Sequence, residues 1–552
     1  MPSVLAVEQG VHYLSVERLC TTVPKPISQR NTASPWSRTQ QCPQLLSDPQ
    51  KKEFNQKIDS VFSTKTAEQV FYQYISSFAP KCPIVVFPPG TNAAHVRENK
   101  PVLFLSILGI ASVGFCSAAE QRQLAVDVRG YLADRAIVRG EKSLELVQAL
   151  QVTSLWYRAP DDYRQMNLNQ LAHIATTMAI DLGLDRVNML EPAVTARDNL
   201  SIILRRPNTT PWTVKLDDYL ADLHQLQIAD TDEFLCRHIA TERLCHDIDR
   251  ELFLSDPARS VPLWDPKTLA MLEVFQARND WTFSNQMQSL QNALIRFGMF
   301  ASSLYSHEVT LHVNHNIEEF KAPFSAKSLK TYNFFGTHGP TKSHISMLHN
   351  IVVAAHGLLD TFLGLSVSDM LALPPHIYGG RVIYAVIILI KIHTAITMPG
   401  TGCQSFICSE DLRLEVYLET LECISRALLA KDERSALSRA FLIISQLKDW
   451  FYRRFRRPSE AEENKPSDLP IDNGQGNPST HGPTARIYDL SVDMQSAAEA
   501  TLPENVAPPD GHGCQFDEVI QPPVLSNSSS RNSPTVVTDT WFQEFFNVEM
   551  LN

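Results

Sequence analysis

Apolar residues recur at helical spacing through most of the chain between residues 67 and 457. The clearest stripe runs over Leu168–Leu182, where apolar side chains fall three or four residues apart and so share one helix face. Asn167 precedes this stripe and Gly183 follows it, and these residue types are common at the N-cap and at the C′ position. A second stripe over Leu437–Phe451 predicts another helix. The spacing therefore predicts an all-α body of many helices.

Three apolar runs test this prediction. Residues 102–119 are 18 residues without a charge, which is the lower limit for a membrane span. Serines and glycines dilute their hydrophobicity and no basic flank follows, so we expect a helix buried in a bundle and no membrane segment. The run Val382–Ile390 is too short to span a bilayer and is expected to be core. Only Cys82–Gly90 looks extended, and prolines interrupt it.

Both ends of the chain differ from the body. Residues 1–66 are polar and rich in proline, serine and glutamine, which predicts a disordered linker segment. Residues 458–552 hold 11 of the 34 prolines, with 15 acidic against 3 basic residues, which predicts a disordered acidic tail. The body, 67–457, is left close to neutral. It therefore lacks the concentrated basic stripe that is typical of nucleic-acid binding.

Motifs for catalysis are absent from the sequence. It contains no phosphate-binding loop, dinucleotide fingerprint, nucleophile elbow or His-Glu-x-x-His. The ten cysteines include no Cys-x-x-Cys pair, which argues against a zinc ribbon and favours a reducing compartment. We therefore expect no enzyme, no metal and no cofactor, although a catalytic triad of residues distant in the chain stays open.

Two local clusters could suggest a metal or acid–base site. His307, His312 and His315 are close in sequence, but His307 lies off the helix face that the other two would share. We expect solvated or hydrogen-bonded loop histidines there rather than ligands. The cluster Cys245–Asp247 is expected to form an exposed helix turn.

Five long segments carry a family resemblance. They are TAEQVFYQYISSFAPKCPIVVF (66–87), KPVLFLSILGIASVG (100–114), GEKSLELVQALQVTSLWYRAPDDYRQMNLNQLAHIATTMAIDLGLDR (140–186), LLDTFLGLSVSDMLALPPHIYGGRVIYAVIILIKI (358–392) and ALSRAFLIISQLKDWFYR (436–453). Together they resemble the regulatory region of fungal zinc-cluster transcription factors, over about residues 66–457. The most distinctive parts are Trp156-Tyr157 and DLGLDR at 181–186.

The resemblance implies an all-helical regulatory domain that holds an activation segment in check and senses a metabolite or a partner. It also implies nuclear localisation, a homodimer, and control of metabolic or secondary-metabolite pathway genes. The family carries an N-terminal DNA-binding module in which six cysteines hold two zinc ions. This chain departs from that pattern, because only Cys20 and Cys42 precede Ala67. We expect either that the first exons are missing from the gene model, towards which we lean, or that a partner supplies the contact with DNA.

The basic run RRFRR follows the last predicted helix. Its cations are Arg453, Arg454, Arg456 and Arg457. Cations at a helix C-terminus are stabilised by the helix dipole, so a solvated cap is the ordinary interpretation. The functional alternative is a nuclear import signal or a phosphate contact.

The chain ends in an acidic and aromatic segment, residues 539–551. Its apolar residues are Trp541, Phe542, Phe545, Phe546, Val548 and Leu551. In a helix, Trp541, Phe545 and Val548 would share one face, while interspersed acidic residues keep the segment soluble. This pattern predicts an activation segment that folds as it binds the transcription coactivator machinery. The alternatives are an ordinary helix docked on the body, or a helical ligand-binding protein or enzyme whose tail is incidental.

Overall fold

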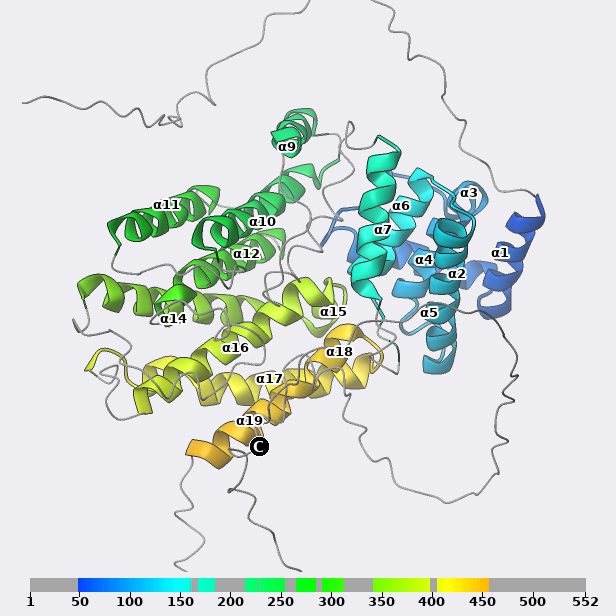
Figure 1. The fold of residues 1–552 in the computed structure, drawn as a ribbon. Helices are drawn as coiled ribbons and strands as arrows, with labels where there is room; N and C mark the ends of the chain where they lie inside the picture. The colour runs from blue at the N-terminus through cyan, green and yellow to red at the C-terminus, as the bar shows by residue number, and fades with distance from the viewer. Residues whose placement is uncertain are drawn as a thin grey trace, which may run out of the picture. The chain divides into compact units, whose positions relative to one another are not determined.

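The fold is described from a computed structural model (Figure 1). The described residues are 48–158, 160, 167–183, 214–227, 229–253, 265–283, 290–311, 341–397 and 405–455. Within these ranges the regular structure is helical, with one isolated bridge between Val113 and Cys116 and no strand. The prediction of an all-α fold is confirmed. Described residues up to Asp449 belong to one compact unit, and Trp450–Phe455 belong to a second.

Seven helices form a first group. They are α1 (Asp48–Val61), α2 (Thr64–Gln73), α3 (Ala93–Asn99), α4 (Pro101–Ala111), α5 (Ala118–Ala133), α6 (Leu144–Leu155) and α7 (Leu168–Asp181). Helix α4 contacts α1, α2, α3, α5 and α6, and α6 also packs on α7. Every residue of α4 is buried, because apolar side chains surround the whole helix.

Two boundaries differ from those predicted for this group. Helix α1 lies inside 1–66, so the expectation of an unstructured segment is wrong for 48–61. The uncharged run 102–119 is not one helix, because α4 ends at Ala111 and the side chain of Ser117 caps the start of α5. The predicted burial of its first part is confirmed.

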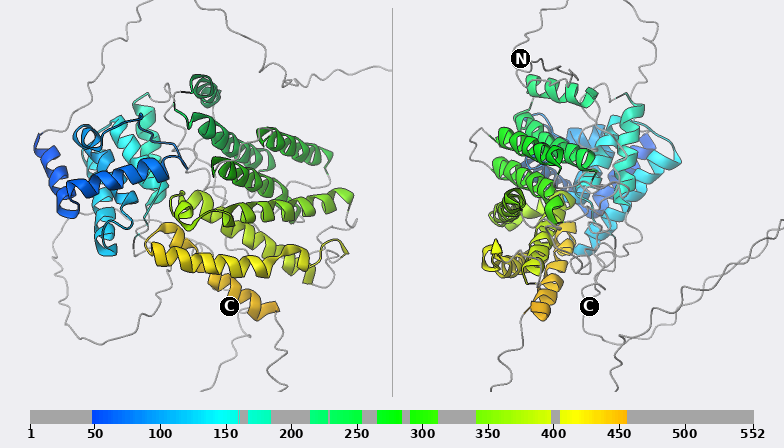
Figure 2. Two further views of the ribbon diagram at one scale, coloured as in Figure 1. Left: turned by 180° about the vertical axis from the view of Figure 1, so that it is seen from behind. Right: turned by 60° about the vertical axis from the view of Figure 1, so that its left-hand side comes forward.

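A second group follows. Its helices are α9 (Val214–Leu226), α10 (Asp232–Leu252), α11 (Pro266–Phe283), α12 (Leu290–His307), α14 (Lys342–Leu363), α15 (Val367–Leu371), α16 (Pro375–Thr397), α17 (Leu414–Lys431), α18 (Ala436–Ala440) and α19 (Leu442–Phe455). Helix α12 packs between α10 and α14, and α14 packs in turn on α16 (Figures 1 and 2). Short helices α15 and α18 contact each other and α17.

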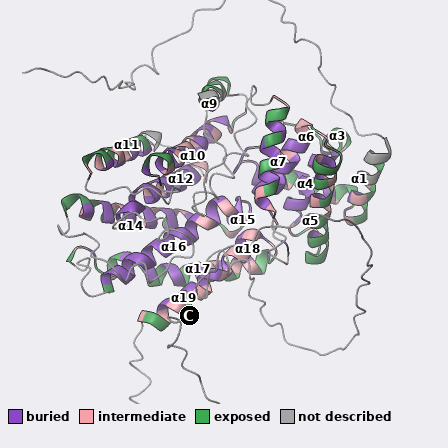
Figure 3. Ribbon diagram, in the orientation of Figure 1, coloured by how far each residue is buried: buried purple, intermediate pink, exposed green. Residues whose placement is uncertain are grey.

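Helix α16 is the most deeply buried element of this group, as its purple ribbon in Figure 3 shows. Both α14 and α16 are long and apolar enough to cross a membrane by length and composition. In α16, however, 89% of the most apolar window is covered by protein. The run Val382–Ile390 is therefore core, as predicted, although the helix that contains it is much longer than the run.

The two helical stripes have different outcomes. Helix α7 spans Leu168–Asp181, and Gly183 has the left-handed φ of +69° expected after a helix end. Asn167 is at the N-cap, but its side chain makes no capping bond and serves another residue. The stripe over Leu437–Phe451 is divided between α18 and α19, because the chain turns at Phe441.

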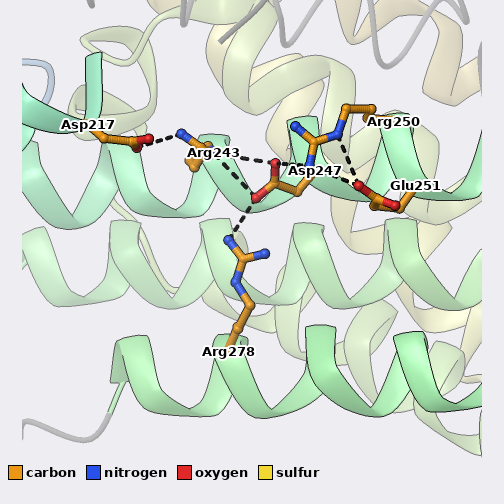
Figure 4. A network of polar contacts seen from close by, with 6 residues as sticks. All are labelled: Asp217, Arg243, Asp247, Arg250, Glu251 and Arg278. Atoms are coloured by element: carbon orange, nitrogen blue, oxygen red, sulfur yellow. Dashed lines mark hydrogen bonds and ion pairs between the residues drawn. The ribbon is translucent and has the colours of Figure 1, made fainter. Parts of the chain in front are cut away.

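The cluster Cys245–Asp247 lies within α10, where the expected exposed turn is wrong, because His246 is half-buried and the other two residues are buried. Cys245 and Asp247 are buried, because the neighbouring Leu244, Ile248 and Leu252 pack in the hydrophobic core. Asp247 forms ion pairs with Arg243, Arg250 and Arg278 (Figure 4). Arg243 also pairs with Asp217 of α9, at 2.6 Å. One buried carboxylate thereby helps to join α9, α10 and α11.

Candidate functional site

A cavity of about 300 Å³ lies where the end of α6 meets the short helices α15 and α18. Its apolar wall includes Phe78, Ile110, Trp156 and Leu371, and its polar wall includes Arg158, Lys431 and Asp432. The first helix group contributes one side and the second group the other. Ligand sites in proteins are commonly concave, largely apolar and equipped with a few polar groups, which this cavity reproduces.

Trp156 joins the two helix groups at the cavity. Helix α6 ends there, and its indole Nε1 donates a 2.9 Å hydrogen bond to the carbonyl of Ala372, 216 residues away. The ring meets Tyr74 and Phe78 edge-on at centroid distances of 6.0 and 5.8 Å. Edge-to-face contacts of this kind stabilise aromatic clusters beyond the area they bury. Trp156 is consequently held rigidly, with only 4% of its surface exposed.

Tyr157 fixes the chain on the other side. Its hydroxyl donates to Asn167 Oδ1 at 2.9 Å and accepts from the Asn167 backbone N–H at 3.1 Å. This pair explains why the Asn167 side chain does not cap α7. Burial raises the pKa of Tyr157, while the Asn167 bond and the guanidinium of Arg129, 5.7 Å from the ring, oppose that shift. The hydroxyl therefore stays protonated and acts as a structural donor.

Arg158 is one of the charged residues on the cavity wall, together with Lys431 and Asp432. Its Nη2 lies 3.3 Å from Asp432 Oδ2 and donates to the carbonyl of Ile110 at 3.3 Å. Its Nη1 is 3.5 Å from Gln121 Oε1. Charge-assisted N–H···O bonds are normally about 2.7–2.9 Å long, so all three contacts are weak. The Nε atom is buried and has no partner among the described residues.

The rim of the cavity adds a second cation. Lys431, at the end of α17, bonds to the hydroxyl of Ser368 in α15. Nearby, Lys81 pairs with Asp369 at 3.1 Å and donates to the Ser77 carbonyl at 2.5 Å. Burial acts to raise the pKa of Asp369, but hydrogen bonds from Ser366 and Lys81 hold it below its ordinary value. These contacts bring the two helix groups together around the cavity.

A second buried ion pair lies away from the cavity, between α10 and α16. Arg381 donates from both terminal nitrogens to Glu242, at 2.9 and 2.8 Å. Both side chains are almost fully covered, at 6% and 2% exposure. The pair has the fork geometry in which arginine and carboxylate satisfy each other. It can therefore hold the core together but has little capacity left for a ligand.

His376, near the start of α16, connects that helix to α6 through a bond with the backbone carbonyl of Ser154. The residue as a whole is only partly buried, but its Nε2 is covered and has no partner among the described residues. Burial lowers the pKa of His376 to about 4, so the imidazole is neutral at pH 7.

Of the predicted site residues, the structure describes two. Arg453 and Arg454 are exposed in the last turn of α19, which fits either a helix cap or a surface contact. Arg456, Arg457 and the apolar residues of 539–551 lie outside the described residues, so their predicted roles stay predictions.

The histidine cluster is described only at His307. It is buried at the end of α12, not in a loop, and its Nδ1 lies 2.8 Å from the Ser303 carbonyl. Its Nε2 contacts the Asn350 amide at 3.3 Å. His312 and His315 fall outside the described residues. No group of three His, Cys, Asp or Glu residues is arranged to hold a metal within the part of the chain that the structure describes.

Comparison with known proteins identifies transcription factors. The chain is 32% identical over 237 residues to transcription factor pbcR of Emericella nidulans, which is 36% of this chain and 32% of pbcR. It is 33% identical over 130 residues to transcription factor himD of Aspergillus japonicus, covering 23% of this chain and 21% of himD. Its curated relatives are fungal transcription factors.

A third relative, transcriptional regulator WAR1 of Candida albicans, is 27% identical over 126 residues, 22% of this chain and 13% of WAR1. The chain thus spans about a third or less of the length of the curated relatives it matches. No family model matches the chain. No solved structure matches it either.

The sequence singled out Trp156-Tyr157 as distinctive but assigned no role to the pair. It missed Arg158 and Asp432 entirely, because they are 274 positions apart and neither forms a motif. The available signal was an arginine that directly follows an apolar helix and the Trp156-Tyr157 pair.

Proposed function

We propose that this protein is a fungal transcription regulator of the zinc-cluster type, which acts in the nucleus on metabolic or secondary-metabolite pathway genes. The observation that carries the proposal is the 32% identity with transcription factor pbcR over 237 residues. The all-helical body agrees with the regulatory region that the sequence resembles. An enzymatic role has no comparable support, and its absence stays a prediction.

In this proposal the terminal segment 539–551 supplies the output. Trp541, Phe542, Phe545 and Phe546 would enter an apolar groove of the coactivator machinery, as disordered segments do when they fold on binding. The helical body would restrain that segment until a signal releases it. The basic run 453–457 would assist nuclear import. Contact with DNA would come from a module outside this sequence or from a partner, and the body would form a homodimer.

The proposal as a whole is tested in the native fungus. A fluorescently tagged chain should concentrate in the nucleus, and deletion of the gene should lower the transcripts of a coherent set of pathway genes. Exclusion from the nucleus together with an unchanged transcriptome would contradict the proposal.

The output segment is tested with a reporter. Residues 501–552 fused to a foreign DNA-binding domain should activate transcription, and alanine at Trp541, Phe542, Phe545 and Phe546 should lower it by about tenfold or more. Phe516→Ala is the matched control, since it removes an aromatic ring of the same tail outside 539–551. Equal activity of the quadruple variant and the control would refute the assignment.

A further inference from the structure

We propose that the exposed face of α5 is a docking surface for residues 4–14 of the same chain, which fold onto it as an amphipathic helix. This contact lies within the protein and does not depend on a role in transcription, because amide exchange of the purified chain can measure it alone.

An apolar stripe runs along the exposed face of α5 and into the π-helical turn Asp134–Val138 that follows it. Its four positions are spaced four, three and four residues apart, and all are exposed: Val126, Gly130, Ala133 and Ile137. Val126 is 49% exposed and Ile137 is 64% exposed. This alternating spacing is the seven-residue repeat with which two helices pair along a seam. The stripe therefore has the pattern that a second helix requires.

The centre of the stripe lets another helix approach closely. Gly130 has no side chain, and a Cβ added there would meet nothing within 4 Å. Beside it lies a groove of about 480 Å³, lined by residues of α5 and by Phe54 of α1. The rings of Phe54 and Tyr131 are 4.7 Å apart at their centroids and form an aromatic wall of this groove. Small residues between larger ones bring two helix axes closer together.

The charges around the groove favour an occupant with little charge. Each of the four charged residues that line it has a partner of opposite sign, in the pairs Lys57 with Asp127, Asp134 with Arg139, and Arg135 with Glu141. The surface therefore offers no excess of positive charge. The terminal segment 539–551 has three acidic residues and would gain no electrostatic attraction here.

Residues 4–14 have the complementary pattern, although they lie outside the described residues. Their apolar positions are spaced three, four and three residues apart: Val4, Val7, Val11 and Leu14. Glu8 is the only acidic or basic residue among them apart from His12. In a helix these four positions would span about 15 Å, and the four positions on α5 span about 16 Å. Two seams of similar length can therefore interlock.

The attachment of the segment favours it over a separate protein. Residues 15–47 join it to Asp48, the first residue of α1, and α1 supplies Phe54 to the groove. A flexible linker of these 33 residues has a root-mean-square reach of about 30 Å, which gives an effective concentration in the millimolar range. Gly10 disfavours a helix in isolation, so the segment would become helical only as it docks.

Hydrogen–deuterium exchange of the purified full chain, followed by mass spectrometry, tests this contact. The amides of residues 4–14 should exchange at least about tenfold more slowly than in an isolated peptide of the same sequence, because a docked helix protects them. Protection should be equal at about 1 and 50 µM protein, since the contact is intramolecular. Free exchange would overturn the proposal. Protection seen only at the higher concentration would place the segment on a second copy and would overturn it too.

A pair of variants locates the docking surface. Gly130→Glu places a charged side chain in the centre of the stripe, and it should return exchange of residues 4–14 to the rate of the isolated peptide. The fold of α5 should survive, because the new side chain enters open space. Ala430→Glu, at an exposed position of α17, is the matched control and should keep the wild-type protection. Protection that survives Gly130→Glu would place the segment elsewhere and refute the proposal.

A third variant tests whether the docked segment is helical. Gly10→Ala removes the residue that most disfavours a helix, so exchange of residues 4–14 should slow by about a further fivefold. Unchanged or faster exchange in Gly10→Ala would show that the segment does not dock as a helix.

Discussion

Arg381 with Glu242, and Arg158 with Asp432, are both buried ion pairs between residues far apart in sequence. Their side chains are almost equally covered, at 6% and 2% exposure for the first pair and 10% and 4% for the second. Their geometries differ. Arg381 makes two bonds of 2.9 and 2.8 Å to one carboxylate, whereas Arg158 makes one contact of 3.3 Å to Asp432 and leaves Nε without a described partner.

This difference shows that two almost equally covered ion pairs can differ in how completely their hydrogen bonds are formed. Burying a charge costs hydration free energy. Only an ion pair with good geometry, whose remaining donors and acceptors are also hydrogen-bonded, offsets that loss. The two short bonds from Arg381 to Glu242 offset this loss within the helical core. The contacts of Arg158 offset this loss only in part, because they are longer and its covered Nε has no described partner.

The largest expected effect on stability is at the pair of Arg381 with Glu242. Arg381→Met leaves the Glu242 carboxylate buried without its partner, so the free energy of unfolding should fall by about 3–5 kcal/mol. Urea denaturation measures the change. The double variant Arg381→Met with Glu242→Leu is the control and should recover much of the loss, because no lone buried charge remains. A loss below about 1 kcal/mol for the single variant would show that the carboxylate is solvated.

The next largest effect on stability is expected at Trp156, which bonds the first helix group to the second. Trp156→Phe keeps an aromatic ring but removes the donor to the Ala372 carbonyl, and it should lower the free energy of unfolding by about 1–3 kcal/mol. Thermal and urea denaturation check this value. An exposed aromatic, Tyr72→Phe, is the control and should change stability little. Equal effects of the two substitutions would mean that the indole bond contributes nothing to the packing of the groups.

A double-mutant cycle compares the two pairs directly. The coupling energy between Arg158 and Asp432 should be below about 1 kcal/mol, whereas that between Arg381 and Glu242 should exceed about 2 kcal/mol. The single contact of 3.3 Å is the reason for the smaller value. Equal coupling energies would contradict the distinction between the two pairs that their bond lengths indicate.

The smallest effect concerns Asp369 beside the cavity, whose side chain is 34% exposed. Asp369→Asn should cost about 0.2–1 kcal/mol at pH 7, since the pair with Lys81 is partly screened by water. Because its folded-state pKa lies below the ordinary 3.8, the stabilisation is complete above that value and is lost as pH falls through the folded pKa. The stability difference between wild type and variant should therefore vanish in acid, and a difference that persists there would contradict the charge-based explanation.

Much of the fold could be predicted from the spacing of apolar residues. Helix α7, its terminal Gly183 and the burial of Val382–Ile390 agree with the pattern, because the face that a helix buries is repeated every turn. The break at Phe441 was missed because a short turn leaves the apolar spacing unchanged. The helix over 48–61 was missed because most of its residues are polar and only a few, such as Phe54 and Ile58, mark its buried face. The buried Asp247 was missed because its three arginines lie on two helices.

By itself, the sequence determined the all-α class, the apolar α4 and α16, and the resemblance to fungal transcription factors. These properties depend on side-chain periodicity and on long patterned segments, which are local in the chain. Only the tertiary structure decided which charges meet. Arg158 faces Asp432, and Trp156 reaches Ala372, because ends of helices that are more than 200 residues apart in the chain lie next to each other. Contacts at that separation depend on where the folded chain places its helix ends, so neither pair leaves a mark in the local pattern.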